Sequence, residues 1–162
     1  MGPVLFLDVD GPLLPFGDGV PGAPGLARLD PAHGPRLAAL PCELVWATTW
    51  MAEANAEIAP RLGLPDLRIA DWADDPAAEE ADARRGLHWK TRGLVALAGG
   101  RPFAWVDDEI GEADRAWVAQ HHGRALLHRV DPRLGLTDAD YVALDTWLRS
   151  SATTAVARGT RT

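Results

Sequence analysis

Two carboxylates stand one residue apart at the end of the first apolar run of the chain. Residues 4–7 are Val-Leu-Phe-Leu, and Asp8, Asp10 and Gly11 follow at once. Residues two apart in a buried strand point to the same side, so we expect both carboxylates at the strand's carboxyl end, where open α/β sheets bind ligands. Two like charges held close require a cation or a shared proton, and Mg²⁺ prefers such oxygen ligands. The alternative is an Asp-x-Asp-Gly turn that only ends a strand.

Other reactive side chains follow in a defined order along the chain. They are Thr48 and Thr49 after the strand-like residues 43–47, Lys90 ahead of a helix-like stretch, and Asp107 and Asp108 after residues 102–106. The order Asp-x-Asp, Thr, Lys, Asp-Asp resembles the four motifs of the haloacid dehalogenase (HAD) superfamily, phosphohydrolases with an aspartate nucleophile. Segments 5–11, 43–50, 88–91 and 101–109 are similar to the HAD domain associated with Swiss Army Knife RNA repair proteins.

The resemblance implies roles in phosphoryl transfer for these side chains. Asp8 would attack phosphorus and form an aspartyl-phosphate, and Asp10 would protonate the leaving group and later activate water. The Thr48 hydroxyl and the Thr49 backbone N–H would hold phosphate oxygens, while Lys90 would neutralise the nucleophile and the transferring group. The expected activity is that of a Mg²⁺-dependent phosphatase.

The same resemblance implies a magnesium site. Asp8 and Asp108 would coordinate Mg²⁺ through their side chains, and Asp10 would do so through its backbone carbonyl. Asp107 would support the site by orienting the lysine or a metal-bound water.

One residue departs from the superfamily pattern. Pro12 follows Gly11, which is expected to contact the substrate, at a position where threonine or valine is usual. Proline lacks a backbone N–H and fixes φ, which puts the geometry of the turn that aims Asp10 in question. Two alternatives therefore stay open. One is a weakly active or inactive HAD domain that binds a phosphorylated partner or a nucleic-acid end, and the other is a phosphotransferase.

Strand-like and helix-like segments alternate along the chain. Strands are expected near 4–8, 43–47, 67–70, 102–106 and 125–130, and helices near 33–40, 51–62, 90–98, 112–121 and 138–149, with a further short helix at 76–85. Helices between successive strands predict a parallel sheet covered on both faces. We therefore expect an α/β protein with a three-layer, Rossmann-like HAD fold.

Two connections are longer than this fold requires. Residues 12–31 are rich in glycine and proline, and residues 71–86 are acidic and rich in alanine. Long loops in compact domains are often functional, but neither segment is large enough for a substantial cap domain, so we expect an open site. Residues 1–150 are predicted to form one catalytic domain, and residues 151–162, which lack apolar periodicity, a flexible tail.

Composition limits the partners of the protein. The net charge is −7, so there is no overall attraction for nucleic acid, although Arg84 and Arg85 could contribute locally if they are not simply a solvated face. No apolar run approaches the ~20 residues of a membrane helix, and the chain enters a strand without a signal peptide. A single cysteine, Cys42, precludes an internal disulfide. We expect a cytoplasmic protein with a phosphorylated substrate, a nucleotide or nucleic-acid end among the candidates.

Seven tryptophans are many for a chain of this size. Trp46 and Trp105 lie within predicted strands and are expected in the core. Trp50, Trp72 and Trp89 stand close to the motifs in sequence and are interpreted as packing residues, with a nucleobase-stacking platform as the alternative. The neighbouring His88 is interpreted as a surface residue, with a contact to the substrate as the alternative.

Overall fold

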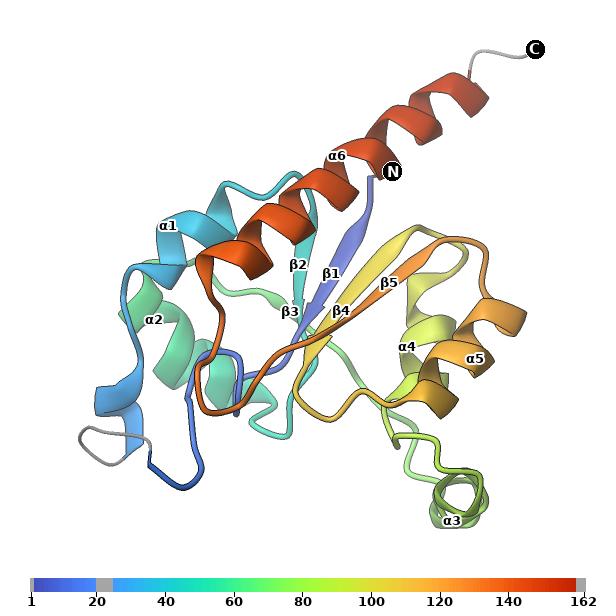
Figure 1. The fold of residues 1–162 in the computed structure, drawn as a ribbon, viewed down its shortest axis with the longest axis horizontal. Coiled ribbons are helices and arrows are strands. Elements are labelled where there is room, and N and C mark those ends of the chain that lie inside the picture. Colours follow the sequence, from blue (N-terminus) through green and yellow to red (C-terminus); the bar gives the residue numbers. More distant parts are fainter. Residues whose placement is uncertain (1, 20–24, 160–162) are drawn as a thin grey trace.

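The computed structural model describes residues 2–19 and 25–159, which form an α/β fold around a parallel sheet (Figure 1). The strands are β1 (Val4–Leu7), β2 (Glu43–Trp46), β3 (Arg68–Ile69), β4 (Phe103–Asp107) and β5 (Ala125–Arg129). Their order across the sheet is β3-β2-β1-β4-β5, and every neighbouring pair is parallel. The predicted α/β class and central parallel sheet are confirmed.

Helices cover both faces of the sheet. One face carries α1 (His33–Ala38), the π-helical turn η2 (Ala54–Ile58), α2 (Ala59–Leu62) and α6 (Asp138–Gly159), and the other carries α4 (Thr91–Ala98) and α5 (Glu112–His121). The three-layer arrangement predicted from the alternation of elements is therefore present. Among the described residues, no helix is long and apolar enough to cross a membrane.

The side chains of β1 alternate between two cores. Leu5 and Leu7 pack with the side chains of α1, α2 and α6, whereas Val4 and Phe6 pack with those of α4 and α5. Because both faces of the strand are buried, its sequence is a continuous apolar run rather than an alternation of apolar and polar residues. The apolar run therefore passes directly into a charged residue at Asp8.

The chain reverses its direction of sheet growth at β1. It first adds β2 and β3 on one side of β1 and then returns to add β4 and β5 on the other. Leu7 is paired with Val106, so Asp8 and Asp107 come next on adjacent strands. Ligand sites of open α/β sheets lie at such a reversal, beyond the carboxyl ends of the strands.

The helix expected over 51–62 is present but contains a widened turn. Met51 has a left-handed backbone, with φ 49°, and the helix begins after it at residue 52, passes through the π-helical turn η2 and continues as α2. The N–H of Ala59 bonds to the carbonyl of Ala54, five residues back. Pro60 cannot donate a hydrogen bond to position 56, and its ring crowds that carbonyl, so the widened turn accommodates it. The helix ends as predicted at Gly63, whose φ is 69°.

The last helix runs further than predicted. It was expected to end near residue 149, but α6 continues to Gly159, so the segment assigned as a tail is helical that far. Residues 151–158 contain three alanines and neither glycine nor proline. Extending an existing helix needs no new nucleation, so a segment without helix-breaking residues continues it without an apolar stripe. The remainder of the assigned tail, residues 160–162, lies outside the described residues.

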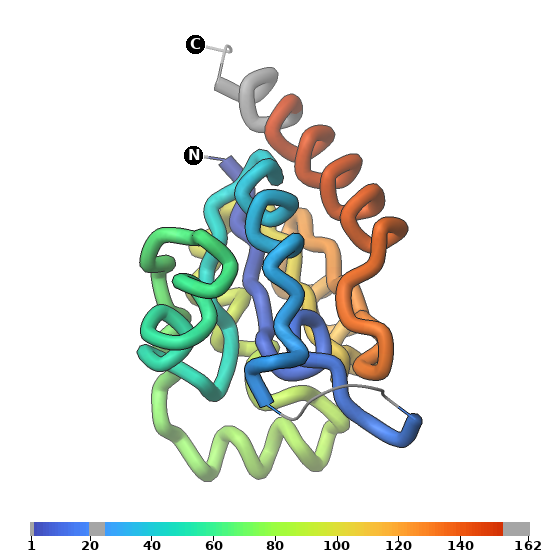
Figure 2. Tube along the Cα trace, turned by 90° about the vertical axis from the view of Figure 1, so that its left-hand side faces the viewer, coloured from blue at the N-terminus to red at the C-terminus, as the bar shows by residue number. Residues whose placement is uncertain are grey.

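The two long connections contain only short elements where they are described. The first includes η1 (Gly25–Arg28), with residues 20–24 outside the description, and the second includes α3 (Pro76–Arg84). Both connections lie at the same end of the molecule (Figure 2), beyond the carboxyl ends of the strands. In the described part of either connection there is no separate cap domain.

Candidate active site

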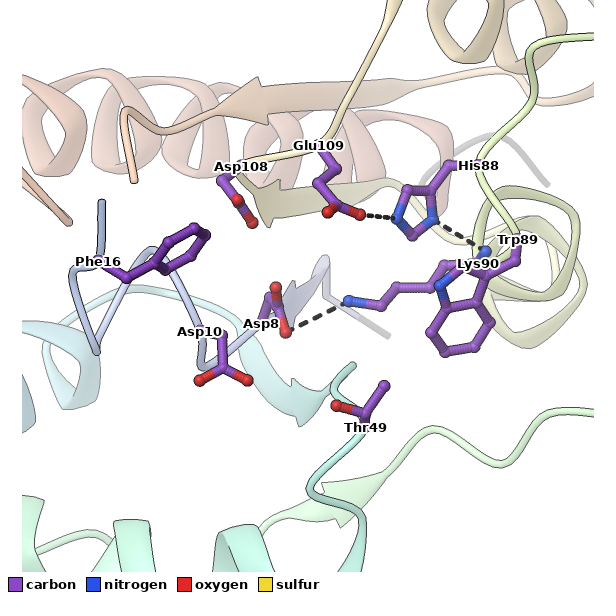
Figure 3. Close-up of a pocket in the computed structure, with 9 residues that line it drawn as sticks. All are labelled: Asp8, Asp10, Phe16, Thr49, His88, Trp89, Lys90, Asp108 and Glu109. Atoms are coloured by element: carbon purple, nitrogen blue, oxygen red, sulfur yellow. Dashed lines mark hydrogen bonds and ion pairs between the residues drawn. The ribbon is translucent and has the colours of Figure 1, made fainter. Parts of the chain in front are cut away.

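Asp8 lies in the middle of the carboxyl edge of the sheet. Its backbone N–H donates a 3.1 Å hydrogen bond to the carbonyl of Val106 on β4. Its carboxylate lies 3.3 Å from the ammonium nitrogen of Lys90, which also donates a 2.7 Å bond to Asp107. All three side chains are buried, and Figure 3 shows the lysine reaching toward Asp8 from the turn before α4. The expected contact between Asp107 and the lysine is thus present.

Three carboxylates crowd together at this point. Asp8, Asp107 and Asp108 each place an oxygen within 4.8 Å of the others. Burial raises the pKa of Asp8 to about 7, although Lys90 opposes the shift, and the charge of Asp107 adds to it. Burial and the same neighbouring charge raise the pKa of Asp108 to about 6. Removal of water and like-charge repulsion both disfavour the ionised carboxylates in the absence of a cation.

The donor set fits a magnesium ion. When ionised, the three carboxylates carry two more negative charges than the single ammonium of Lys90 balances. A divalent cation would neutralise that excess, and carboxylate oxygens are the ligands that Mg²⁺ prefers. Asp8 and Asp108 are the available ligands, because Asp107 is committed to the lysine at 2.7 Å.

Asp10 does not join this cluster through its side chain. Its residue is exposed, and its carboxylate accepts a 3.1 Å hydrogen bond from the indole nitrogen of Trp50. Asp8 and Asp10 line the same cavity, but strand alternation does not place them there, because β1 ends at Leu7 and the chain then turns. Among the described residues, the carboxylates grouped closely with Asp8 are those of Asp107 and Asp108.

Gly11 makes room for one of these carboxylates. Its φ is 100°, a region that residues with a Cβ rarely adopt. A Cβ at this position would lie 2.9 Å from Cγ of Asp108. Gly11 does not line the cavity described below, so its position favours close packing behind Asp108 over the predicted substrate contact.

The turn after β1 tolerates Pro12. Its hydrogen bonds are donated by Gly11 to Leu14, and by Leu13 and Leu14 to Val9, at 3.0 Å each. None of them requires a donor at position 12. The Pro12 carbonyl accepts a 2.8 Å bond from the N–H of Leu136, which ties the turn to the loop before α6. The departure from the superfamily pattern therefore leaves this turn intact.

The two threonines after β2 have different positions. Thr48 is almost fully buried, and its hydroxyl oxygen accepts a 3.2 Å bond from the N–H of Trp50, whereas Thr49 faces the site. Residues 49 and 50 stand just before the left-handed Met51, which makes the backbone turn sharply here. Sequence reasoning assigned a hydroxyl contact to Thr48, but in the structure the side chain that faces the cavity is that of Thr49.

His88 is part of the site and not a surface residue. Only 7% of its side chain is exposed. Its Nδ1 lies 3.1 Å from the backbone nitrogen of Lys90 and must accept that hydrogen bond, so in neutral histidine Nε2 carries the proton and donates to Glu109 at 3.0 Å. The interpretation from sequence is corrected, because the tight turn before α4 folds the imidazole inward.

These side chains enclose a cavity of about 160 Å³. It is lined by Asp8, Asp10, Phe16, Thr49, His88, Trp89, Lys90, Asp108 and Glu109 (Figure 3). Sequence reasoning gave no role to Phe16 or Glu109 and no firm one to Trp89. Glu109 and Trp89 adjoin predicted site residues in sequence, and this proximity could have identified them as cavity residues. No sequence feature identified Phe16, because only the fold of the loop after β1 brings it to the cavity.

The sequence matches the family described as the HAD domain in Swiss Army Knife RNA repair proteins over residues 4–141. The chain belongs to this family. Its superfamily comprises phosphohydrolases and phosphotransferases, and the matched span contains every residue of the cavity. No curated protein and no solved structure matches the chain.

The tryptophans of this HAD domain have mixed positions. Trp46 and Trp105 are fully buried in the core, as predicted. Trp72 packs edge-on against Trp89 with ring centroids 5.1 Å apart, and 37% of Trp89 stays exposed beside the cavity. Trp50 is half-buried against the core. Packing therefore accounts for most of the tryptophan surface, while Trp50 and Trp89 also border the site.

The other residues considered from sequence lie apart from the cavity of the HAD domain. Arg84 pairs with Glu80 on the exposed face of α3, and Arg85, the residue after this helix, is exposed as well. Burial raises the pKa of the half-buried Cys42 thiol to about 12, so it is protonated and unreactive at neutral pH.

Proposed function

We propose that this HAD domain is a Mg²⁺-dependent phosphatase that acts on a phosphomonoester through an aspartyl-phosphate at Asp8. The observation that carries the proposal is the contact of the Asp8 carboxylate with Lys90 inside a buried carboxylate cluster. That arrangement holds a nucleophile and a cation at the switch point of the sheet, where a phosphate would bind. The cavity of about 160 Å³ suits a group of phosphate size.

The first half of the reaction transfers the phosphoryl group to the protein. An oxygen of Asp8 forms a bond to phosphorus while the bond from phosphorus to the leaving oxygen breaks. Asp10, in its protonated form, gives its proton to that oxygen, so that the leaving group departs as a neutral alcohol. Lys90 faces the reacting oxygens and stabilises the charge that accumulates on them.

The second half releases phosphate. The Asp10 carboxylate takes a proton from water, the hydroxide forms a bond to phosphorus, and the bond from phosphorus to Asp8 breaks. Asp8 returns as a carboxylate, and Asp10 is again protonated. The exposure of Asp10 to solvent and its fixed bond to Trp50 support this role, because a general base must reach water in a defined orientation.

The proposal assigns the metal to Asp8 and Asp108, with the Asp10 carbonyl as a further ligand. When bound, Mg²⁺ would supply positive charge to the phosphate oxygens. Asp107 would keep Lys90 in position. The substrate class, a nucleotide or nucleic-acid end among the candidates, and a cytoplasmic location remain parts of the proposal.

Hydrolysis of 4-nitrophenyl phosphate tests the proposal. We expect turnover in magnesium that excess chelator removes, and no turnover for Asp8→Asn, because the amide cannot form an acyl phosphate. Asp10→Asn should retain a phosphorylated Asp8, visible by intact-protein mass spectrometry, since the intermediate loses its base. Asp66→Asn is the matched control, as Asp66 is exposed and precedes β3 at the opposite end of the sheet. Undiminished turnover of Asp8→Asn or in excess chelator would refute the mechanism.

A further inference from the structure

A second cavity adjoins the catalytic one. It has a volume of about 470 Å³. It is lined by Asp10, Leu14, Pro15, Phe16, Gly25, Leu26, Arg28 and Trp50. Asp10 and Phe16 also line the catalytic cavity, so these two side chains form the boundary between the two spaces. The second cavity falls in the size range of small-molecule sites, whereas the catalytic one is smaller.

The walls of this second cavity are mostly apolar and held in place, with Asp10 and Arg28 as the charged lining residues. Leu14 belongs to the core, and Leu26 and Trp50 pack against the core from η1 and from the turn after β2. The backbone N–H of Phe16 donates a 2.8 Å hydrogen bond to Pro132. The guanidinium of Arg28 donates a 3.0 Å bond to the carbonyl of Pro15, which joins η1 to the loop after β1. The shape is therefore fixed from three parts of the chain.

The second cavity lies where a leaving group must go. Figure 3 shows Asp10 and Phe16 on one side of Asp8, and Lys90 and Trp89 on the other. In-line displacement by Asp8 places the leaving oxygen away from the nucleophile, and Asp10 must reach that oxygen to protonate it. The carbon body attached to the oxygen then extends past Asp10, into the apolar space.

We infer that the second cavity binds the leaving group of the substrate and that this group contains an aromatic ring. The inference rests on the proposed function, because that function sets the direction in which the leaving group departs. Leu14, Leu26 and the rings of Phe16 and Trp50 offer an aromatic body dispersion and burial of apolar surface. A small alcohol such as glycerol would leave these apolar side chains uncovered.

A pair of synthetic esters tests this inference. Phenyl phosphate and 2-naphthyl phosphate have leaving groups of similar acidity, so their intrinsic reactivities are close, but only the second adds a ring to be buried. We expect kcat/KM to be roughly fivefold or more higher for the naphthyl ester. Phe16→Ala and Leu26→Ala should each bring this ratio toward one. Leu134→Ala is the matched control, since Leu134 is 66% exposed and lines neither cavity.

Binding to the Asp8→Asn protein separates this inference from the proposed function. Calorimetry with the two esters should show the same preference for the naphthyl ester, and Phe16→Ala in the same background should remove it. Preferential binding without hydrolysis by the unmodified protein would overturn the proposed function and support an aromatic site. Magnesium-dependent hydrolysis with equal kcat/KM for both esters, unchanged by Phe16→Ala, would overturn the inference and leave the proposed function standing.

Discussion

Asp114, near the start of α5, accepts a 2.7 Å hydrogen bond from the hydroxyl of Thr91, the first residue of α4. The same oxygen accepts the backbone N–H of His88 at 2.8 Å, and the other oxygen accepts the N–H of Gly111 at 2.9 Å. The carboxylate is buried. One side chain therefore fixes the turn that carries Lys90 against the helix that follows β4.

Asp114→Asn should destabilise the protein and lower its activity. An amide has one acceptor oxygen instead of two, so at least one buried donor loses its partner, at a cost of about 1–3 kcal/mol. Urea denaturation and the rate of 4-nitrophenyl phosphate hydrolysis measure the two effects. Asp75→Asn is the control, because Asp75 caps the exposed start of α3 and asparagine caps equally well. Equal stability losses in both variants would contradict the role given to Asp114.

Lys90→Met should lower the stability of the protein, because the carboxylate cluster loses its positive charge. The variant leaves Asp8 and Asp107 buried without their ammonium partner, and removal of one member of a buried ion pair costs about 3–5 kcal/mol. Magnesium should restore part of this stability by replacing the lost positive charge. Urea denaturation with and without magnesium tests the prediction, which fails if the variant is as stable as the unmodified protein in chelator.

The affinity for magnesium should rise with pH. The pKa of Asp8 in the folded, metal-free protein is about 7, above its ordinary value of 3.8. The folded state therefore binds this proton more tightly than the unfolded chain, and the stability it confers is complete below the unfolded pKa and lost as pH rises toward 7. Because Mg²⁺ must displace the proton, its stabilising effect should grow over the same interval.

Thermal unfolding with and without magnesium, at about pH 5 and about pH 8, measures this linkage. The increase in melting temperature caused by magnesium should be small at the lower pH and larger at the higher one. Asp8→Asn should show little pH dependence from this position, since its amide does not titrate. An equal magnesium effect at both pH values in the unmodified protein would contradict the prediction.

Gly11→Ala should weaken magnesium binding as well as destabilise the backbone. The new Cβ would lie 2.9 Å from Cγ of Asp108, a metal ligand in the proposal, and the φ of 100° is unfavourable in itself. Gly99→Ala is the matched control, because Gly99 has a φ of 57° with no atom near its Cβ position. Both variants should lose about 1 kcal/mol from the backbone, but only Gly11→Ala should raise the Kd for magnesium in a titration. A comparable change in that Kd for Gly99→Ala would argue against a specific contact.

Local sequence predicted the elements well and the side-chain directions poorly. Apolar runs such as residues 4–7 and 103–106 are buried on both faces, so they could be recognised without tertiary information. The direction of Asp10 depends on a turn that begins one residue earlier than expected. Whether the side chain of Thr48 or that of Thr49 faces the cavity depends on the backbone at Met51. Such single dihedral angles have only weak signatures in the surrounding sequence.

Most of the second cavity was beyond sequence reasoning for a different reason. Trp50 and the long connection 12–31 were noted from sequence, but Phe16 and Leu26 carry no reactive group that would single them out, and the three side chains come from three separate segments. Their assembly depends on long-range hydrogen bonds such as that from Phe16 to Pro132. Sites made of ordinary apolar residues become visible only when the fold has brought them together.

Trp50→Phe should slow the substrates that depend most on Asp10. The indole N–H donates to the Asp10 carboxylate at 3.1 Å, so phenylalanine keeps a ring in the second cavity but releases the acid from its fixed orientation. Benzyl phosphate has a poor leaving group and needs protonation, whereas 4-nitrophenyl phosphate has a good one and needs it little. We expect kcat to fall about tenfold for the benzyl ester, as loss of a hydrogen bond to a charged group allows, and much less for the nitrophenyl ester.

Trp72→Phe is the matched control, because the Trp72 indole N–H is buried without a partner among the described residues. This variant should preserve the ratio of the two rates. An equal decrease for both esters in Trp50→Phe would show that the indole contributes packing and does not position Asp10.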